Sequence, residues 1–112
     1  MRYFLNAAER KKQGGTLYFE FQQGPYRGKH WLERSVYLYA DLFDELLLFH
    51  LFAKAIPCFN YYGPTEVTPA QYEQLKALAL ARGGEAAALI RELDIWARHC
   101  FLTENVFTIC GI

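Results

Sequence analysis

The sequence lacks several features that would assign it directly to a functional class. Its cysteines are few, and Cys58, Cys100 and Cys110 are odd in number and form no C-x-x-C pair, which argues against a disulfide framework and a zinc ribbon. Basic residues do not exceed acidic ones, with twelve of each, whereas nucleic-acid-binding proteins normally carry a net positive charge. We therefore expect reduced cysteines and no direct binding of nucleic acid.

Long apolar runs are also missing. In the most hydrophobic segment the longest uncharged run extends from Leu46 to Ala53, far short of the roughly 18 to 20 apolar residues that cross a bilayer. The N-terminal segment reaches Glu9 and a basic run too early for a secretory signal peptide. These absences predict a cytoplasmic protein without a membrane partner.

Hydrophobic and aromatic side chains are abundant. With 112 residues, 53% hydrophobic and 17% aromatic, the chain is long enough for one globular domain, residues 1–112, and too apolar to be disordered. Its nine Phe, eight Tyr and two Trp exceed what a core of this size usually needs. Either the core is rich in aromatic rings, or several rings lie on the surface, where they favour contacts with a partner.

The segment Ser35–Ile56 is predicted to be the centre of the fold. It contains no proline or glycine, and Pro57 follows it, so nothing within it would end a helix. Its apolar residues cover most of a helical circumference, a pattern typical of a buried helix. We therefore expect one long buried helix over residues 35–56, with the other elements packed around it.

Strands are expected on both sides of this segment. Thr16–Gln22 alternates apolar and other side chains, with Leu17, Phe19 and Phe21 on one face. The β-branched run Val106–Ile109 predicts a short strand that pairs with Thr16–Gln22. Arg2–Leu5 is a third, short candidate, and residues 26–34 are expected to form a loop.

Two helix starts are predicted from capping boxes, in which a side chain and a backbone N–H three residues apart bond reciprocally. Asn6 with Glu9 predicts a short helix over Ala7–Gln13, although residues 7–13 could instead form a hairpin arm that turns at the following two glycines. Thr68 with Gln71 predicts a second helix, which extends to about residue 82.

A third helix is expected over Glu85–Leu102, after the Gly83-Gly84 stop. Together these elements predict an α+β fold, in which a small antiparallel sheet is packed by about three helices.

No spacing in the sequence matches a catalytic or metal site. His30, His50 and His99 share no ligand spacing such as H-x-x-x-H, and His99 and Cys100 are adjacent, so on a helix they point in different directions. We therefore expect no catalytic residues, no metal and no cofactor. The alternative is a small enzyme or ligand-binding domain with its site around the Cys58–Val67 loop, because a loop this long is often functional.

An acidic and aromatic surface is the strongest candidate for a binding site. On the expected helix three carboxylates share a face with two apolar side chains, and the Cys58–Val67 loop adds three rings. Such a surface suits a basic protein partner, because charges steer the encounter and rings are buried on contact. A solvated helix face is the ordinary alternative. The predicted partner-binding residues are Asp41, Asp44, Glu45, Leu48, Phe52, Phe59, Tyr61 and Tyr62.

The last six residues, Phe107-Thr108-Ile109-Cys110-Gly111-Ile112, resemble the F-T-I-x-G-[IV] ending of small bacterial immunity proteins of contact-dependent growth inhibition and related polymorphic toxin systems. The resemblance implies a cytoplasmic, non-enzymatic protein that binds one cognate toxin domain and blocks its active site. Many such toxins are nucleases with basic clefts, which an acidic face would complement. The resemblance identifies no binding residue, and a homodimer or accessory subunit is a third reading of the aromatic surface.

Overall fold

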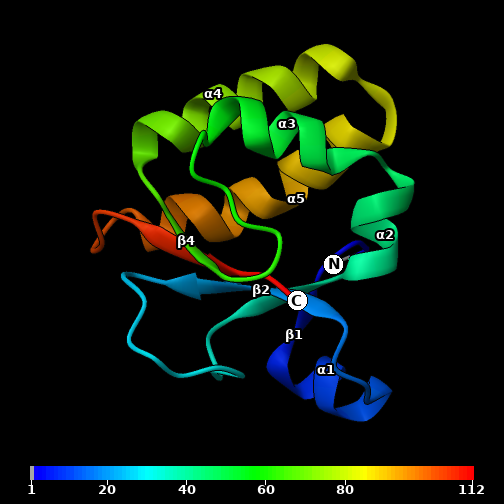
Figure 1. Ribbon diagram of the computed structural model, residues 1–112, viewed down its shortest axis with the longest axis vertical. Helices are drawn as coiled ribbons and strands as arrows, with labels where there is room; N and C mark the ends of the chain where they lie inside the picture. The colour runs from blue at the N-terminus through cyan, green and yellow to red at the C-terminus, as the bar shows by residue number, and fades with distance from the viewer. Residues whose placement is uncertain (1) are drawn as a thin grey trace.

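A five-stranded antiparallel sheet lies beneath the main group of helices (Figure 1). The computed structural model describes residues 2–112. The strands lie in the spatial order β1-β3-β2-β5-β4, so the last strand of the chain is inserted between β2 and β4. Their bounds are β1 (Leu5–Asn6), β2 (Tyr18–Gln23), β3 (Val36–Tyr39), β4 (Pro64–Val67) and β5 (Phe107–Cys110).

The helices lie mainly on one side of this sheet. Figure 1 shows α3, α4 and α5 stacked over one face, while α1 lies beside β1 on the other side. This arrangement confirms the α+β fold class. The helices are α1 (Ala7–Gln13), α2 (Ala40–Glu45), α3 (Leu48–Ala55), α4 (Pro69–Arg82) and α5 (Gly84–Cys100). None of them, over residues 2–112, has the length and apolar character needed to span a membrane.

Both capping boxes are present. The Glu9 backbone N–H donates to Asn6 Oδ1 at 2.8 Å, and the Asn6 N–H donates to Glu9 Oε1 at 2.9 Å. Residues 7–13 therefore form the predicted helix and not a hairpin arm. Thr68 and Gln71 bond in the same reciprocal way at 3.2 and 3.0 Å. The predicted pairing of the C-terminal strand with β2 is confirmed too, with Phe21 opposite Ile109.

The prediction of one helix over residues 35–56 is wrong. The segment contains strand β3, then α2 and α3, and only the last two are helical. Val36 to Leu38 are all buried. When every side chain of a short run is apolar and buried, the hydrophobic pattern shows neither the alternation of a strand nor the 3.6-residue period of a helix, so it cannot distinguish the two.

The break between α2 and α3 lies at Leu47, whose φ of 53° places it in the left-handed region. The Arg82 guanidinium donates to the carbonyls of Leu46 and Leu47 at 2.8 and 3.0 Å. Carbonyl groups at the end of a helix have no hydrogen-bond donor within the helix, and Arg82 supplies that donor here.

Both faces of β2 are buried. Phe19 and Phe21 contribute to the core between the sheet and α3, α4 and α5. Glu20 and Gln22 point to the other face and are also buried, because residues 24–35 fold back over them. The alternation of β2 was predicted, but its second face is covered by this loop and not by solvent.

The Cys58–Val67 segment is a loop only in its first half. Residues Pro64–Val67 form β4, which pairs with β5 in the register Thr65 to Ile109. A strand at this position was not predicted, because a run of two turn formers and three aromatic residues shows no alternation. The three cysteines are unpaired, as expected from their spacing.

Candidate functional site

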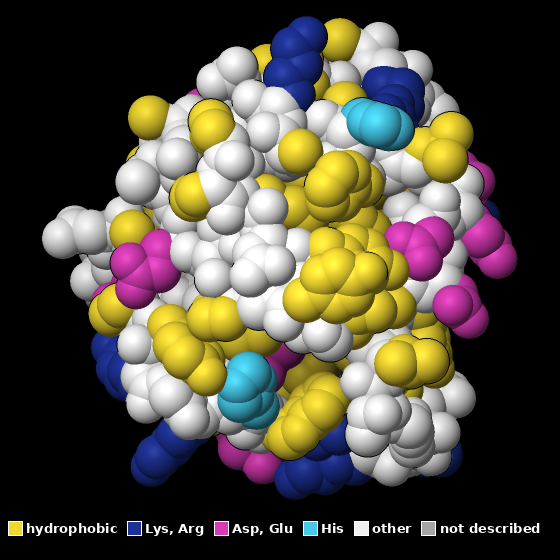
Figure 2. Space-filling view, in the orientation of Figure 1, with side chains coloured by type: hydrophobic (Ala, Val, Ile, Leu, Met, Phe, Trp, Pro, Cys, Tyr) yellow, Lys and Arg dark blue, Asp and Glu magenta, His cyan; other side chains and the backbone are white. Residues whose placement is uncertain are grey.

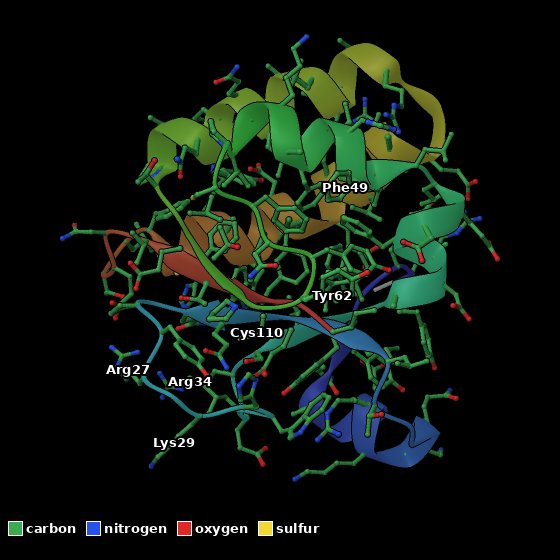
Figure 3. All side chains as sticks on the ribbon, viewed as in Figure 1. Arg27, Lys29, Arg34, Phe49, Tyr62 and Cys110 are labelled. Carbon is green, nitrogen blue, oxygen red and sulfur yellow. The ribbon has the colours of Figure 1, made fainter. Side chains whose placement is uncertain are left out.

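An exposed group of aromatic rings lies where α3 meets the loop that precedes β4. We call Phe49, Phe59, Tyr61 and Tyr62 the aromatic patch. Phe49 is 41% exposed and Tyr62 is 77% exposed. The ring centroids of Phe49 and Tyr61 are 6.3 Å apart, and those of Tyr61 and Tyr62 are 5.0 Å apart. Figure 2 shows continuous hydrophobic surface in the centre of this view, and Figure 3 places Phe49 and Tyr62 at its two ends.

The inner edge of the patch is packed on the core. Tyr61 contacts Phe19 edge to face, with centroids 5.1 Å apart, and Phe59 lies 5.6 Å from Phe52. Phe19 and Phe52 are themselves buried. Rings that are already packed against the core lose little further conformational entropy when a partner covers them.

Acidic side chains border the patch. Asp41, Asp44 and Glu45 are all exposed on α2, and Figure 2 shows acidic side chains along one edge of the hydrophobic surface. The Tyr61 hydroxyl donates to both carboxylate oxygens of Asp44 at 2.9 Å. Partial burial, followed by this bond to Asp44, raises the pKa of Tyr61 to about 12. Tyr61 therefore remains a neutral donor near pH 7 and links the aromatic patch to α2.

The C-terminal tail positions the loop that carries Tyr61 and Tyr62. The Gly111 N–H donates to the Gly63 carbonyl at 3.0 Å, and the Ile112 N–H donates to the Tyr61 carbonyl at 3.0 Å. A Cβ atom at Gly111 would collide with the Tyr61 carbonyl group. The glycine of the tail is thus required for the close approach of these two backbone segments.

Two of the predicted partner-binding residues are misplaced. Leu48 and Phe52 are each 1% exposed and belong to the core, so they cannot contact a partner. The reason is the break at Leu47, which interrupts the helical phase that was used to extend the acidic face from α2 into α3. The large hydrophobic side chains exposed from the break onward in this segment are Leu47, at 65%, and Phe49, at 41%. The exposure of Leu47 and Phe49 was not predicted, because residues 35–56 contain no proline or glycine that would mark a break in the helix.

Of the other six predicted residues, the structure joins four at the patch, namely Asp44, Phe59, Tyr61 and Tyr62. Asp41 and Glu45 are exposed on the same short helix as Asp44, and Phe59 and Tyr61 are only partly exposed. Adding Leu47 and Phe49 defines what we call the acidic-aromatic surface. Its residues are Asp41, Asp44, Glu45, Leu47, Phe49, Phe59, Tyr61 and Tyr62.

The surface is not part of either of two grooves in the molecule. One groove, of about 290 Å³, is lined by residues that include Arg34 and Glu104. The other, of about 300 Å³, is lined by residues that include Ile95 and Trp96. Neither is lined by Cys58, the thiol around which an enzymatic site was considered. The aromatic patch and these two grooves are therefore separate features of the molecule.

Potential metal ligands converge elsewhere. Within residues 2–112, one group of three such side chains has its ligand atoms within 4.8 Å of one another, namely Glu20, His30 and Cys110. Sequence reasoning missed this group, because its members are far apart in the chain and meet only through strand register and loop folding.

Comparison with known proteins gives no relative from which a role could be transferred, since no family model, curated protein or solved structure matches this chain.

Proposed function

We propose that this protein is a non-enzymatic inhibitor that acts as an immunity protein, and that it binds and blocks a cognate toxin domain through the acidic-aromatic surface. The observation that carries the proposal is the exposure of Phe49 and Tyr62. These two rings belong to an aromatic patch whose inner edge packs on the core, next to a helix with three exposed carboxylates. Large rings near the centre of an interface commonly contribute most of its binding energy.

The backbone at Leu47 supports a role for this surface. A non-glycine residue in the left-handed region costs about 1 to 2 kcal/mol, and Leu47 also exposes most of its side chain. Neither property stabilises the fold. Backbone strain of this kind is typically found at functional sites, and here it accompanies an exposed leucine two residues before Phe49 in the chain.

Charge distribution supports a basic partner. The protein has no net charge, but α2 carries three exposed carboxylates at the acidic-aromatic surface, and one of them, Asp44, bonds to Tyr61. The loop residues Arg27, Lys29 and Arg34 lie well away from the aromatic patch (Figure 3). One guanidinium, that of Arg82, contacts the backbone at Leu47, so carboxylates still outnumber it at this surface. The surface is therefore locally negative. Such a surface attracts a basic cleft, as in a nuclease active site, and speeds the encounter.

A second copy of the chain fits this surface less well. In a symmetric dimer the same patch occurs on both subunits, so the carboxylates of α2 would approach their own counterparts. Like charges at an interface cost binding energy. A heterologous basic partner avoids this cost.

The test first searches the neighbouring genes for a toxin domain, then takes that domain as the partner and measures both neutralisation and binding kinetics. Tyr62→Ala should speed dissociation by at least about 30-fold, which corresponds to a hot-spot loss of about 2 kcal/mol. Ile95→Ala is the matched control, because Ile95 on α5 is as exposed as Tyr62, at 77% each, but lies outside the surface. Ile95→Ala should leave binding unchanged.

Charge reversal tests the acidic part separately. Asp41→Lys with Glu45→Lys should slow association and flatten its dependence on salt, because charges at the rim act mainly on the encounter. The proposal fails if the protein neither binds nor neutralises the toxin. It also fails if Tyr62→Ala and Ile95→Ala behave alike, since the interface would then lie elsewhere.

A further inference from the structure

Strand register brings a carboxylate and a thiol together on the loop-covered face of the sheet. Glu20 of β2 lies directly opposite Cys110 of β5, and side chains of directly opposed residues in antiparallel strands point to the same face. Both residues are 2% exposed. They lie on the face opposite to Phe19 and Phe21, so they are not part of the main core.

Residues 24–35 place an imidazole at the same position. Gln22 Nε2 donates to the Lys29 carbonyl at 2.7 Å, and the backbone N–H groups of Trp31 and Leu32 each donate to Glu20 at 2.8 Å. The residues on both sides of His30 are therefore fixed to β2. Because its neighbours are anchored, His30 is held against the Glu20–Cys110 pair while its ring remains exposed.

We propose that Glu20, His30 and Cys110 bind a divalent transition-metal ion, with Zn²⁺ the best match. The donors are one oxygen, one nitrogen and one sulfur within 4.8 Å of one another, a set that suits Zn²⁺ better than Mg²⁺ or Ca²⁺. A carboxylate and a thiolate together neutralise the charge of the ion. The inference concerns a different part of the molecule from the acidic-aromatic surface and does not depend on the proposed function.

The distances require only a small contraction. Bonds of about 2.3 Å to sulfur and about 2.0 Å to nitrogen and oxygen place tetrahedral ligand atoms roughly 3.5 Å apart. His30 is exposed, so its side chain can rotate to shorten the distances from its ring nitrogen to the other two ligand atoms, while any adjustment between Glu20 and Cys110 must come from their own rotamers. The fourth position would be taken by water, which reaches the site on the side of His30. Figure 3 shows Cys110 at the sheet, above the loop that carries Lys29.

Each ligand keeps bonding capacity for the ion. Glu20 Oε1 accepts a single hydrogen bond, from Trp31, and is the oxygen left for the metal, while Oε2 accepts bonds from Leu32, Ser35 and Tyr37. His30 Nε2 lies 2.9 Å from the Tyr26 hydroxyl. A metal-bound histidine commonly gives its second N–H to such a partner, which would leave Nδ1 to coordinate the metal.

The Cys110 thiol must lose its proton to bind a metal. Burial, and then the charge of Glu20, raise the pKa of Cys110 to about 12, so the free side chain is a protonated thiol near pH 7. Coordination forms the sulfur–metal bond and releases this proton to solvent. The bound ion would then cross-link residues 24–35 to β2 and β5.

The test titrates Zn²⁺, supplied as the chloride, into the purified protein in competition with a chromophoric chelator. We expect one equivalent to bind, and His30→Ala to weaken the affinity by at least about 100-fold, as loss of a ligand from a three-residue site should. His50→Ala is the matched control, because both histidines are exposed. It should change the affinity by less than about two-fold.

Co²⁺ gives a second, spectroscopic readout. Wild-type protein should develop a thiolate-to-cobalt charge-transfer band, and Cys110→Ser should lose it while Cys58→Ser retains it. Cys110 is buried, so Cys110→Ser could impair folding. The exposed His30 can be replaced without this risk, so the zinc affinity of His30→Ala tests the site even if Cys110→Ser does not fold. The proposal is overturned if no stoichiometric binding occurs at about 100 µM Zn²⁺, or if His50→Ala weakens binding as much as His30→Ala does. It is also overturned if the cobalt complex shows no thiolate band.

Discussion

Replacing Leu47 with glycine should separate a binding role from a structural one. Glycine removes the cost of the left-handed backbone, about 1 to 2 kcal/mol. Against this, glycine increases the entropy of the unfolded chain, worth about 0.4 to 1 kcal/mol. About a third of Leu47 is buried, since 65% is exposed, and that fraction of a fully buried leucine amounts to about 0.5 to 1 kcal/mol.

These contributions nearly cancel, so Leu47→Gly should change the free energy of unfolding by less than about 1 kcal/mol. The bonds from Arg82 to the carbonyls of residues 46 and 47 do not depend on the side chain and remain. Affinity for the toxin partner should nevertheless fall by about 1 kcal/mol or more, because an exposed apolar contact is lost from the interface.

Urea denaturation and binding kinetics on the same samples provide the measurement. Leu48→Ala is the control, since the adjacent leucine is 1% exposed and its truncation should cost about 2 to 5 kcal/mol of stability. If Leu47→Gly destabilises the protein by more than about 2 kcal/mol, Leu47 is structural and the strain argument is refuted. Unchanged stability together with unchanged affinity would refute its role in binding.

Two other predictions concern the tail and the tyrosines. Gly111→Ala should cost about 1 to 3 kcal/mol of stability and weaken partner binding, because the new Cβ displaces the Tyr61 carbonyl; Ile112→Ala, measured in the same assays, should have a smaller effect on both. Burial raises the pKa of Tyr37 and Tyr61 to about 12 in the folded state, aided by Glu20 and Asp44 respectively, while the unfolded value stays near 10. Above pH 10 the unfolded state therefore binds fewer protons, and stability should fall as pH rises. Tyr61→Phe should make this loss of stability with pH smaller. If the urea midpoints of wild type and Tyr61→Phe fall equally between pH 10 and 12, the raised pKa of Tyr61 is refuted.

Local sequence signals predicted the parts of the fold that depend on near neighbours. The capping boxes at Asn6 and Thr68 each involve residues three positions apart, so they can be recognised without knowing the tertiary structure. Strand β2 was recognised for a similar reason, because alternation within a few residues is a local property.

The errors came from features that depend on tertiary structure. The apolar run from Val36 to Leu38 is a strand because β1 and β2 pair with it, and no residue within the run indicates this. The break at Leu47 exchanged the exposed and buried sides of α3, so Phe49 replaced Phe52 at the surface. The Glu20, His30 and Cys110 group depends on the register of two strands and on the return of a loop.

The position of β5 has a consequence for how the protein folds during synthesis. β5 is the last strand of the chain, yet it separates β2 from β4 and pairs with both. While residues 107–110 are still inside the ribosome, β2 has one free edge and β4 has no partner in the sheet. Closure of the sheet must wait for the last strand, and long-range pairings of this kind form slowly. The nascent chain therefore exposes an unpaired strand edge until β5 emerges, and chaperones are expected to protect such edges from aggregation.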